Sequence, residues 1–79
     1  MTSAKQSTVQ FLRKEWGIAV FTTGFTKLTD EACELMDAYE NCEDILEATK
    51  IMNLAIRKIT QAQLEAKAAD PVRFEEMSK

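Results

Sequence analysis

Histidine is absent from the 79 residues of this chain, and cysteine, proline and glycine are scarce. Without histidine, no Ser-His or Cys-His pair can activate a nucleophile, and zinc lacks its commonest nitrogen ligand. The two cysteines, Cys33 and Cys42, would stand about 13 Å apart on one helix, whereas a disulfide needs Cα atoms within about 7 Å. We therefore expect reduced, buried thiols, no catalytic residue, no bound metal and no cofactor.

One proline and two glycines also leave little turn chemistry, while 46% of the residues are hydrophobic and 29% are charged. This composition is typical of a folded, helix-rich protein. The sequence predicts an all-α fold in a single domain over residues 1–79. A chain of this length buries only about 60% of its unfolded surface, so its own core is small.

No long apolar run is present. The N-terminal sequence MTSAKQSTVQ lacks the apolar core of a signal peptide, and the most apolar stretch, WGIAVFTTGF at 16–25, is shorter than the about 20 residues that span a bilayer. The sequence therefore predicts a cytoplasmic protein with no membrane partner.

The apolar stretch falls in a predicted N-terminal helix that Ser7 and Thr8 cap and that ends near Thr23, with Gly24 just beyond it. One face of this helix is apolar over Val9, Leu12, Trp16 and Val20, and the second half is apolar all round. The segment GIAVFTT would also suit a strand, but no partner strand is evident.

A second helix is predicted from about 30 to 68, capped by Thr29. Two apolar seams with heptad spacing follow each other along it: Leu28, Ala32, Leu35, Tyr39, Cys42, Leu46 and Thr49, then Ile45, Met52 and Ile59 with Ala48, Ala55 and Ala62. Asn41 is the one plausible break, and a break there would give a compact three-helix monomer. Asp70 and Pro71 predict a short final helical turn. We expect fraying over 1–7 and 72–79.

Taken together, these elements predict a helical hairpin of one short helix and one long helix, with Asn41 as the point at which the long helix would kink. A helix of about 16 residues covers less than half of a partner of 39 residues, so part of the apolar surface stays open. We expect homo-oligomerisation to complete the fold. The interaction residues between protomers are then Trp16, Ile18, Phe21 and Phe25.

Acidic residues concentrate at 28–49, which hold eight carboxylates and no basic residue. Their spacing is that of a helix surface, and a solvated acidic face that keeps the protein soluble explains it. Mimicry of nucleic acid toward a basic groove of another protein is an alternative. Because the net charge is −3, we do not expect the protein to bind DNA directly. The acidic face comprises Asp30, Glu34, Asp37 and Asp44.

The segment EACELMDAYENCEDILE resembles the acidic helices of the all-α nucleoside triphosphate pyrophosphatases, in which a Glu-x-x-Glu pair faces a Glu-x-x-Asp pair. Glu31 and Glu34 match the first pair, while Asp44 and Glu47 stand in reversed order. The resemblance, over about 20 residues, implies Mg²⁺-dependent pyrophosphatase activity.

Basic residues offer another alternative. Brought together with symmetry mates in an oligomer, they would form an anion pocket for a nucleotide phosphate; the set is Lys50, Arg57, Lys58 and Thr60. Our main interpretation is a non-enzymatic binding protein that acts on another protein, as an accessory or inhibitor protein of a bacteriophage or other mobile element does. A nucleotide-sequestering oligomer is the second interpretation and the pyrophosphatase is the third.

Overall fold

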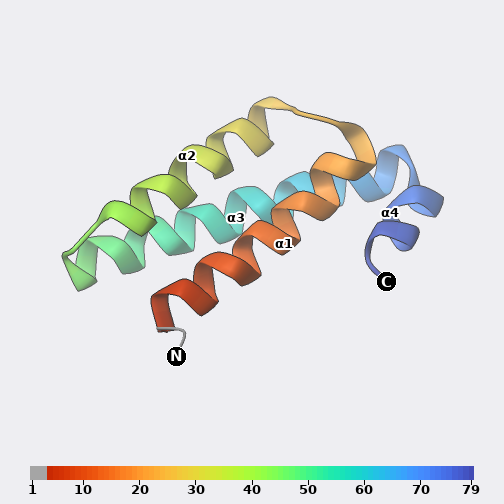
Figure 1. The fold of residues 1–79 in the computed structure, drawn as a ribbon. Coiled ribbons are helices and arrows are strands. Elements are labelled where there is room, and N and C mark those ends of the chain that lie inside the picture. The colour runs from red at the N-terminus through yellow and green to blue at the C-terminus, as the bar shows by residue number, and fades with distance from the viewer. Residues whose placement is uncertain (1–3) are drawn as a thin grey trace.

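The computed structural model describes residues 4–79, and every secondary-structure element in this part of the chain is an α-helix. Four helices follow in order: α1 (Ala4–Thr23), α2 (Lys27–Asn41), α3 (Ile45–Ala69) and α4 (Pro71–Met77). In Figure 1, α3 runs the length of the molecule, with α1 and α2 along it and α4 at the end nearest the α1–α2 turn. The all-α prediction is confirmed, and the strand considered for residues 17–23 is wrong because that segment belongs to α1.

Helix α1 begins at Ala4, earlier than the start expected at Ser7 and Thr8. It ends at Thr23 as predicted. Gly24 follows with φ of 81°, and its N–H donates to the carbonyl oxygen of Val20 over 2.6 Å. A residue without Cβ adopts this left-handed conformation at no steric cost, which is why the helix ends there. The fraying expected at 1–3 lies outside the described residues, and for the remaining terminal residues it stays a prediction.

The start predicted for the second helix is wrong by three residues, because Thr26 and not Thr29 is its N-cap. The two threonines form a reciprocal pair: the Thr29 N–H donates to the Thr26 hydroxyl over 3.3 Å, and the Thr26 N–H donates to the Thr29 hydroxyl over 2.7 Å. This satisfies two backbone donors at the helix start. Thr29 is buried at the third helical position.

The single helix expected over 30–68 is also wrong, since residues 42–44 are not helical. The break follows directly after Asn41, whose side chain donates to the Asp37 carbonyl oxygen over 2.9 Å. Asp44, expected on the acidic face, is the N-cap of α3 and accepts from the N–H groups of Leu46 and Glu47. A capped start three residues after Asn41 lets α3 turn back along α2.

The core lies where α3 meets the other helices. One buried cluster comprises Leu12, Ala32, Met36, Ala55 and Ile59. A second comprises Ala19, Ala62 and Ala66, with Phe74 of α4 packed against it. The alanines allow close approach of the helices. The predicted seams fail at the break, because Ile45 is 81% exposed and Leu46 is 75% exposed.

The surface area is large for the size of the chain. The accessible surface is 5501 Å², whereas a folded monomer of 9.0 kDa is expected to expose about 4,900 Å². The Cα extents of 39 × 28 × 15 Å describe a flat molecule, in which helices have broad outer faces. Among the described helices, none combines the length and apolar character needed to cross a membrane.

Candidate functional site

The exposed apolar side chains lie mainly on the outward sides of α1 and α3. Those that are large and more than a third exposed are Phe11, Phe21, Phe25, Ile45, Leu46, Leu54, Ile56, Leu64, Val72 and Met77. Singly, such residues are ordinary on a protein surface, but grouped on one helix face they mark an interaction surface.

The first group is the α1 apolar face, which we define as Phe11, Ile18 and Phe21 of α1 together with Phe25 of the turn that follows it. The first three recur at steps of seven and three residues, so they share one side of the helix. That side is opposite the buried Leu12 and Ala19. Phe11 is 59% exposed, Phe21 is 64% exposed and Phe25 is 72% exposed, while Ile18 is half-buried.

Two hollows border Phe21 on this face. The smaller, of about 270 Å³, is lined by Arg13, Lys14, Gly17, Ile18, Phe21 and Met77. The larger, of about 600 Å³, is lined by Trp16, Val20, Phe21, Thr22, Gly24, Phe25, Asp70 and Arg73. The Nε of Arg73 donates to the Phe21 carbonyl oxygen over 2.6 Å, which ties α4 to this part of α1. The face therefore offers an exposed aromatic ring and hollows beside it.

Trp16, predicted as an interaction residue, lies between this face and the core. It packs against the first buried cluster, and its Nε1 donates to the Thr29 carbonyl oxygen over 2.7 Å. Its ring centroid lies 6.1 Å from that of Phe25 at an interplanar angle of 54°. Trp16 thus packs against the ring of Phe25 and, through its hydrogen bond to Thr29, joins α1 to α2.

The second group follows α3 along its outer side. The members recur at steps of four and three residues, and we call them the α3 stripe: Leu46, Lys50, Asn53, Arg57, Thr60 and Leu64. All six are exposed. Leucines stand at the two ends, and the two basic residues lie between them. Within the described residues, neither Lys50 nor Arg57 forms an ion pair.

The four residues of the predicted anion pocket do not converge within one chain. Lys58 faces α2, where its Nζ lies 2.8 Å from Oε2 of Glu31. The hydrogen bond from Lys58 holds the pKa of Glu31 below its ordinary value, with the Lys58 charge acting in the same direction. Lys50 and Arg57 stand two helical turns apart, about 10 Å along the axis. Sequence reasoning missed the pair between Lys58 and Glu31 because it placed both residues on one continuous helix.

The predicted acidic face is divided. Asp30, Glu34 and Asp37 are exposed on α2, whereas Asp44 caps α3. Arg13 of α1 lies 3.6 Å from the carboxylate of Asp37 and 3.3 Å from that of Glu40. Within residues 4–79, no three or more carboxylate or thiol side chains are grouped as ligands for a metal ion.

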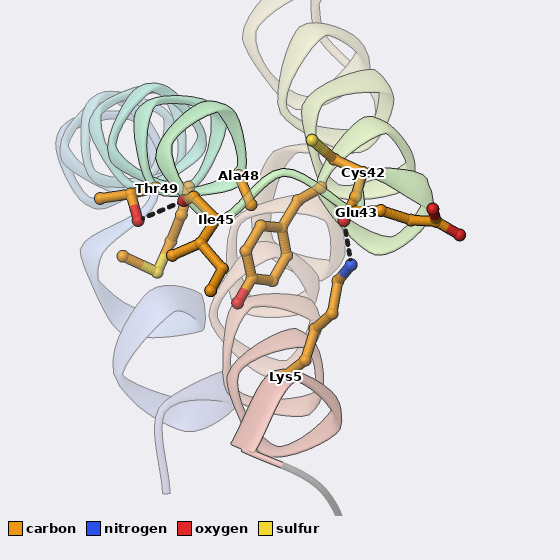
Figure 2. Close-up of a pocket in the computed structure, with 8 residues that line it drawn as sticks. Lys5, Cys42, Glu43, Ile45, Ala48 and Thr49 are labelled. Atoms are coloured by element: carbon orange, nitrogen blue, oxygen red, sulfur yellow. Dashed lines mark hydrogen bonds between the residues drawn. The ribbon is translucent and has the colours of Figure 1, made fainter.

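A further hollow of about 380 Å³ lies at the α2–α3 turn (Figure 2). Lys5 reaches from the first turn of α1 and donates to the Cys42 carbonyl oxygen, and its Nζ lies 5.5 Å from the centre of the Tyr39 ring. Ile45 points into the same space in Figure 2. Cys33 and Cys42 are free and half-buried, so the thiols are less buried than expected. No sequence pattern predicted this hollow, because it arises from the break at 42–44.

No family model matches the chain, and comparisons with curated proteins and with solved structures found no match. The features of the chain that point to a function are therefore the side chains on the α1 apolar face and the α3 stripe. Both consist mainly of exposed side chains of the kinds that protein interfaces use.

Proposed function

We propose that this protein acts without catalysis, by binding other polypeptides, and that it does so as a homo-oligomer formed through the α1 apolar face. The observation that carries the proposal is the exposed Phe21 ring with a hollow on either side of it. A two-fold interface needs one patch that is complementary to itself. A ring beside a hollow meets this requirement, because each protomer fills the hollow of the other.

The area of the face supports the same proposal. A phenylalanine side chain buries about 150–250 Å² when fully covered. At their exposures of 59%, 64% and 72%, Phe11, Phe21 and Phe25 leave roughly 400 Å² open. A stable interface buries about 800 Å² on each partner. The three rings supply about half of this area, and Ile18 and Met77 beside them add to it.

The order of these residues along α1 and the turn after it suggests how two copies would meet. In an antiparallel pair with its two-fold axis near Ile18, Phe11 lies close to the partner's Phe25. The ends of the face then cover each other, and the Phe21 rings flank the centre. The face is therefore long enough to be covered by a second copy of itself.

Sedimentation velocity from about 1 to 200 μM tests the proposal. Burial of one of these rings contributes about 2 to 3 kcal/mol, and a two-fold dimer loses two of them, so Phe21→Ala is expected to weaken self-association by about 1,000-fold or more. Ile18→Asp is expected to weaken it further, because an unpaired carboxylate would enter the apolar contact. Leu64→Ala on α3 is the matched control, since Leu64 is 63% exposed but lies outside the face. A wild-type protein that remains a 9 kDa monomer throughout, with a melting temperature independent of concentration, contradicts the proposal.

For the target beyond self-association, we propose another protein. The small size, acidic balance and absence of histidine suit an accessory or inhibitor protein of a bacteriophage or other mobile element. The second candidate is an oligomer that binds a small anionic nucleotide, favoured by the lack of ion pairs at Lys50 and Arg57 within the described residues. Calorimetric titration with a nucleoside diphosphate separates them, because only the second candidate predicts heat that Arg57→Gln abolishes.

A further inference from the structure

We infer that the α3 stripe is a docking surface for an acidic amphipathic helix of another protein. This rests on the proposed function only in that the protein acts by binding polypeptides, and it does not require self-association. The stripe and the α1 apolar face are on different helices and share no residue.

The spacing of the stripe is that of a helix-packing seam. Its six members alternate by four and three residues over more than two heptads, which keeps one side of a helix facing a partner helix. The fold already uses another side of α3, where Ala55, Ile59 and Ala62 are buried. The stripe is thus a second seam on the same helix, and its Leu46 and Leu64 are 75% and 63% exposed.

The charge on the stripe indicates the chemistry of its partner. Two basic residues of this fold form ion pairs with carboxylates of a neighbouring helix: Lys58 pairs with Glu31, and Arg13 pairs with Glu40. Lys50 and Arg57 form none in the part of the chain that the structure describes. A partner helix with carboxylates seven residues apart, flanked by apolar residues, matches these two cations and the outer leucines. The leucines then supply contact area, and the charges select the partner.

The groove between α2 and α3 adds a place for an apolar side chain of the partner. A hollow of about 450 Å³ beside the stripe is lined by Glu31, Glu34, Leu35, Ala38, Leu54 and Lys58. Leu54, which is 47% exposed, stands at its edge, one turn from both Lys50 and Arg57. Because Lys58 already pairs with Glu31, the lysine in this hollow does not need a carboxylate from the partner. The partner's acidic residues are therefore expected over Lys50 and Arg57.

The experiment uses a fluorescent synthetic helical peptide in which glutamates replace the basic residues of the stripe pattern, L-x₃-E-x₆-E-x₆-L, made in both chain directions. The matched peptide carries lysines in place of the two glutamates. Fluorescence anisotropy with the full chain is expected to show at least tenfold tighter binding of the acidic peptide, in one direction, than of the lysine peptide. Arg57→Glu is expected to weaken binding of the acidic peptide at least tenfold. Lys67→Glu, the same charge change in the last turn of α3, is expected to leave it unchanged.

A charge reversal completes the test. The Lys50→Glu/Arg57→Glu variant is expected to prefer the lysine peptide. Equal binding of the two peptides, absence of binding, or equal effects of Arg57→Glu and Lys67→Glu would overturn the inference. Loss of self-association in Arg57→Glu would also overturn it, since the stripe would then contact a second copy, with the acidic α2 as its partner. Retained peptide binding by a Phe21→Ala monomer supports the inference whatever the outcome for self-association.

Discussion

The indole Nε1 of Trp16 donates a hydrogen bond to the carbonyl oxygen of Thr29 over 2.7 Å. The bond joins the middle of α1 to the first turn of α2, and Thr29 itself is 1% exposed. A donor and an acceptor that lose water on folding cost free energy unless they bond to each other. This contact therefore fixes how α1 lies on α2. It also determines where Phe25, which contacts the Trp16 ring, meets the surface.

Replacing Trp16 by Phe tests this contact. The variant keeps an aromatic ring but loses the donor and part of the ring volume, so we expect a loss of about 1 to 2 kcal/mol of unfolding free energy. Urea denaturation followed by circular dichroism measures it. Val72→Ala, at a site 68% exposed, is the control and is expected to change stability by less than about 0.5 kcal/mol. A Trp16→Phe midpoint equal to that of the control would mean that the hydrogen bond adds nothing.

The break between α2 and α3 depends on the Asp44 cap. Its Oδ1 accepts from the N–H of Leu46 over 2.9 Å and from that of Glu47 over 3.4 Å. We expect Asp44→Ala to cost about 1 kcal/mol and Asp44→Asn to cost much less, because asparagine also caps well. Thermal unfolding of the two variants at equal concentration checks this. Equal melting temperatures would show that packing alone determines the turn.

The break follows Asn41, the one position at which the sequence indicated it, and the residue that caps the next helix is Asp44. Asp44 is followed three residues later by Glu47, and this spacing is typical of a helix start. The start of α2 was ambiguous between Thr26 and Thr29, either of which can cap. Burial of Thr29 decided between them, and burial follows from how three helices pack rather than from local spacing. The end of α1 was predictable because it depends on one residue: Gly24 adopts the left-handed conformation that ends the helix, whatever packs around it.

The exposed apolar residues likewise fall into those that the sequence predicted and those that it did not. Excess apolar residues around α1 predicted that Phe21 and Phe25 would lie outside the core, and both are exposed. The exposure of Leu46 and Ile45 was not predictable, because the heptad count assumed one continuous helix. Because α3 turns back along α2, the heptad spacing of α2 does not continue into α3, and these two side chains lie at the turn. The α3 stripe becomes visible only after that change of direction.

The ion pair between Glu31 and Lys58 predicts a pH dependence. The hydrogen bond from Lys58 lowers the pKa of Glu31 below its ordinary value of 4.5. A carboxyl whose folded pKa is depressed contributes stability above its unfolded pKa, and that contribution is lost as pH falls through the folded pKa. Glu31→Gln is therefore expected to be less stable than the wild type at pH 7, with a difference that closes below about pH 4.5.

Urea midpoints from pH 7 down to pH 3 measure this difference. Glu34→Gln is the control, because Glu34 forms no ion pair in the described part of the chain. Its difference from the wild type is expected to be smaller at pH 7. A Glu31→Gln difference that persists unchanged at pH 3 would show that the loss comes from packing of the side chain and not from its charge.

Gly17 stands in the middle of α1, where glycine costs about 1 kcal/mol relative to alanine. A Cβ added there would lie 3.6 and 3.8 Å from two ring carbons of Phe21, at ordinary contact distance, so the monomer can accept it. The same Cβ would enter the hollow of about 270 Å³ that we propose receives a ring of the partner.

Gly17→Ala is therefore expected to have opposite effects on folding and on association. Unfolding free energy of the monomer, measured at low concentration in urea, should rise by about 1 kcal/mol because alanine favours the helix. Self-association, measured by sedimentation, should weaken by at least about 30-fold, since a two-fold dimer contains this contact twice and overfilling each one costs about 1 to 3 kcal/mol. Asn53→Ala, which improves helix propensity on α3, should stabilise the monomer without changing association. If Gly17→Ala raises stability and leaves association intact, the hollow beside Phe21 is not where two protomers meet.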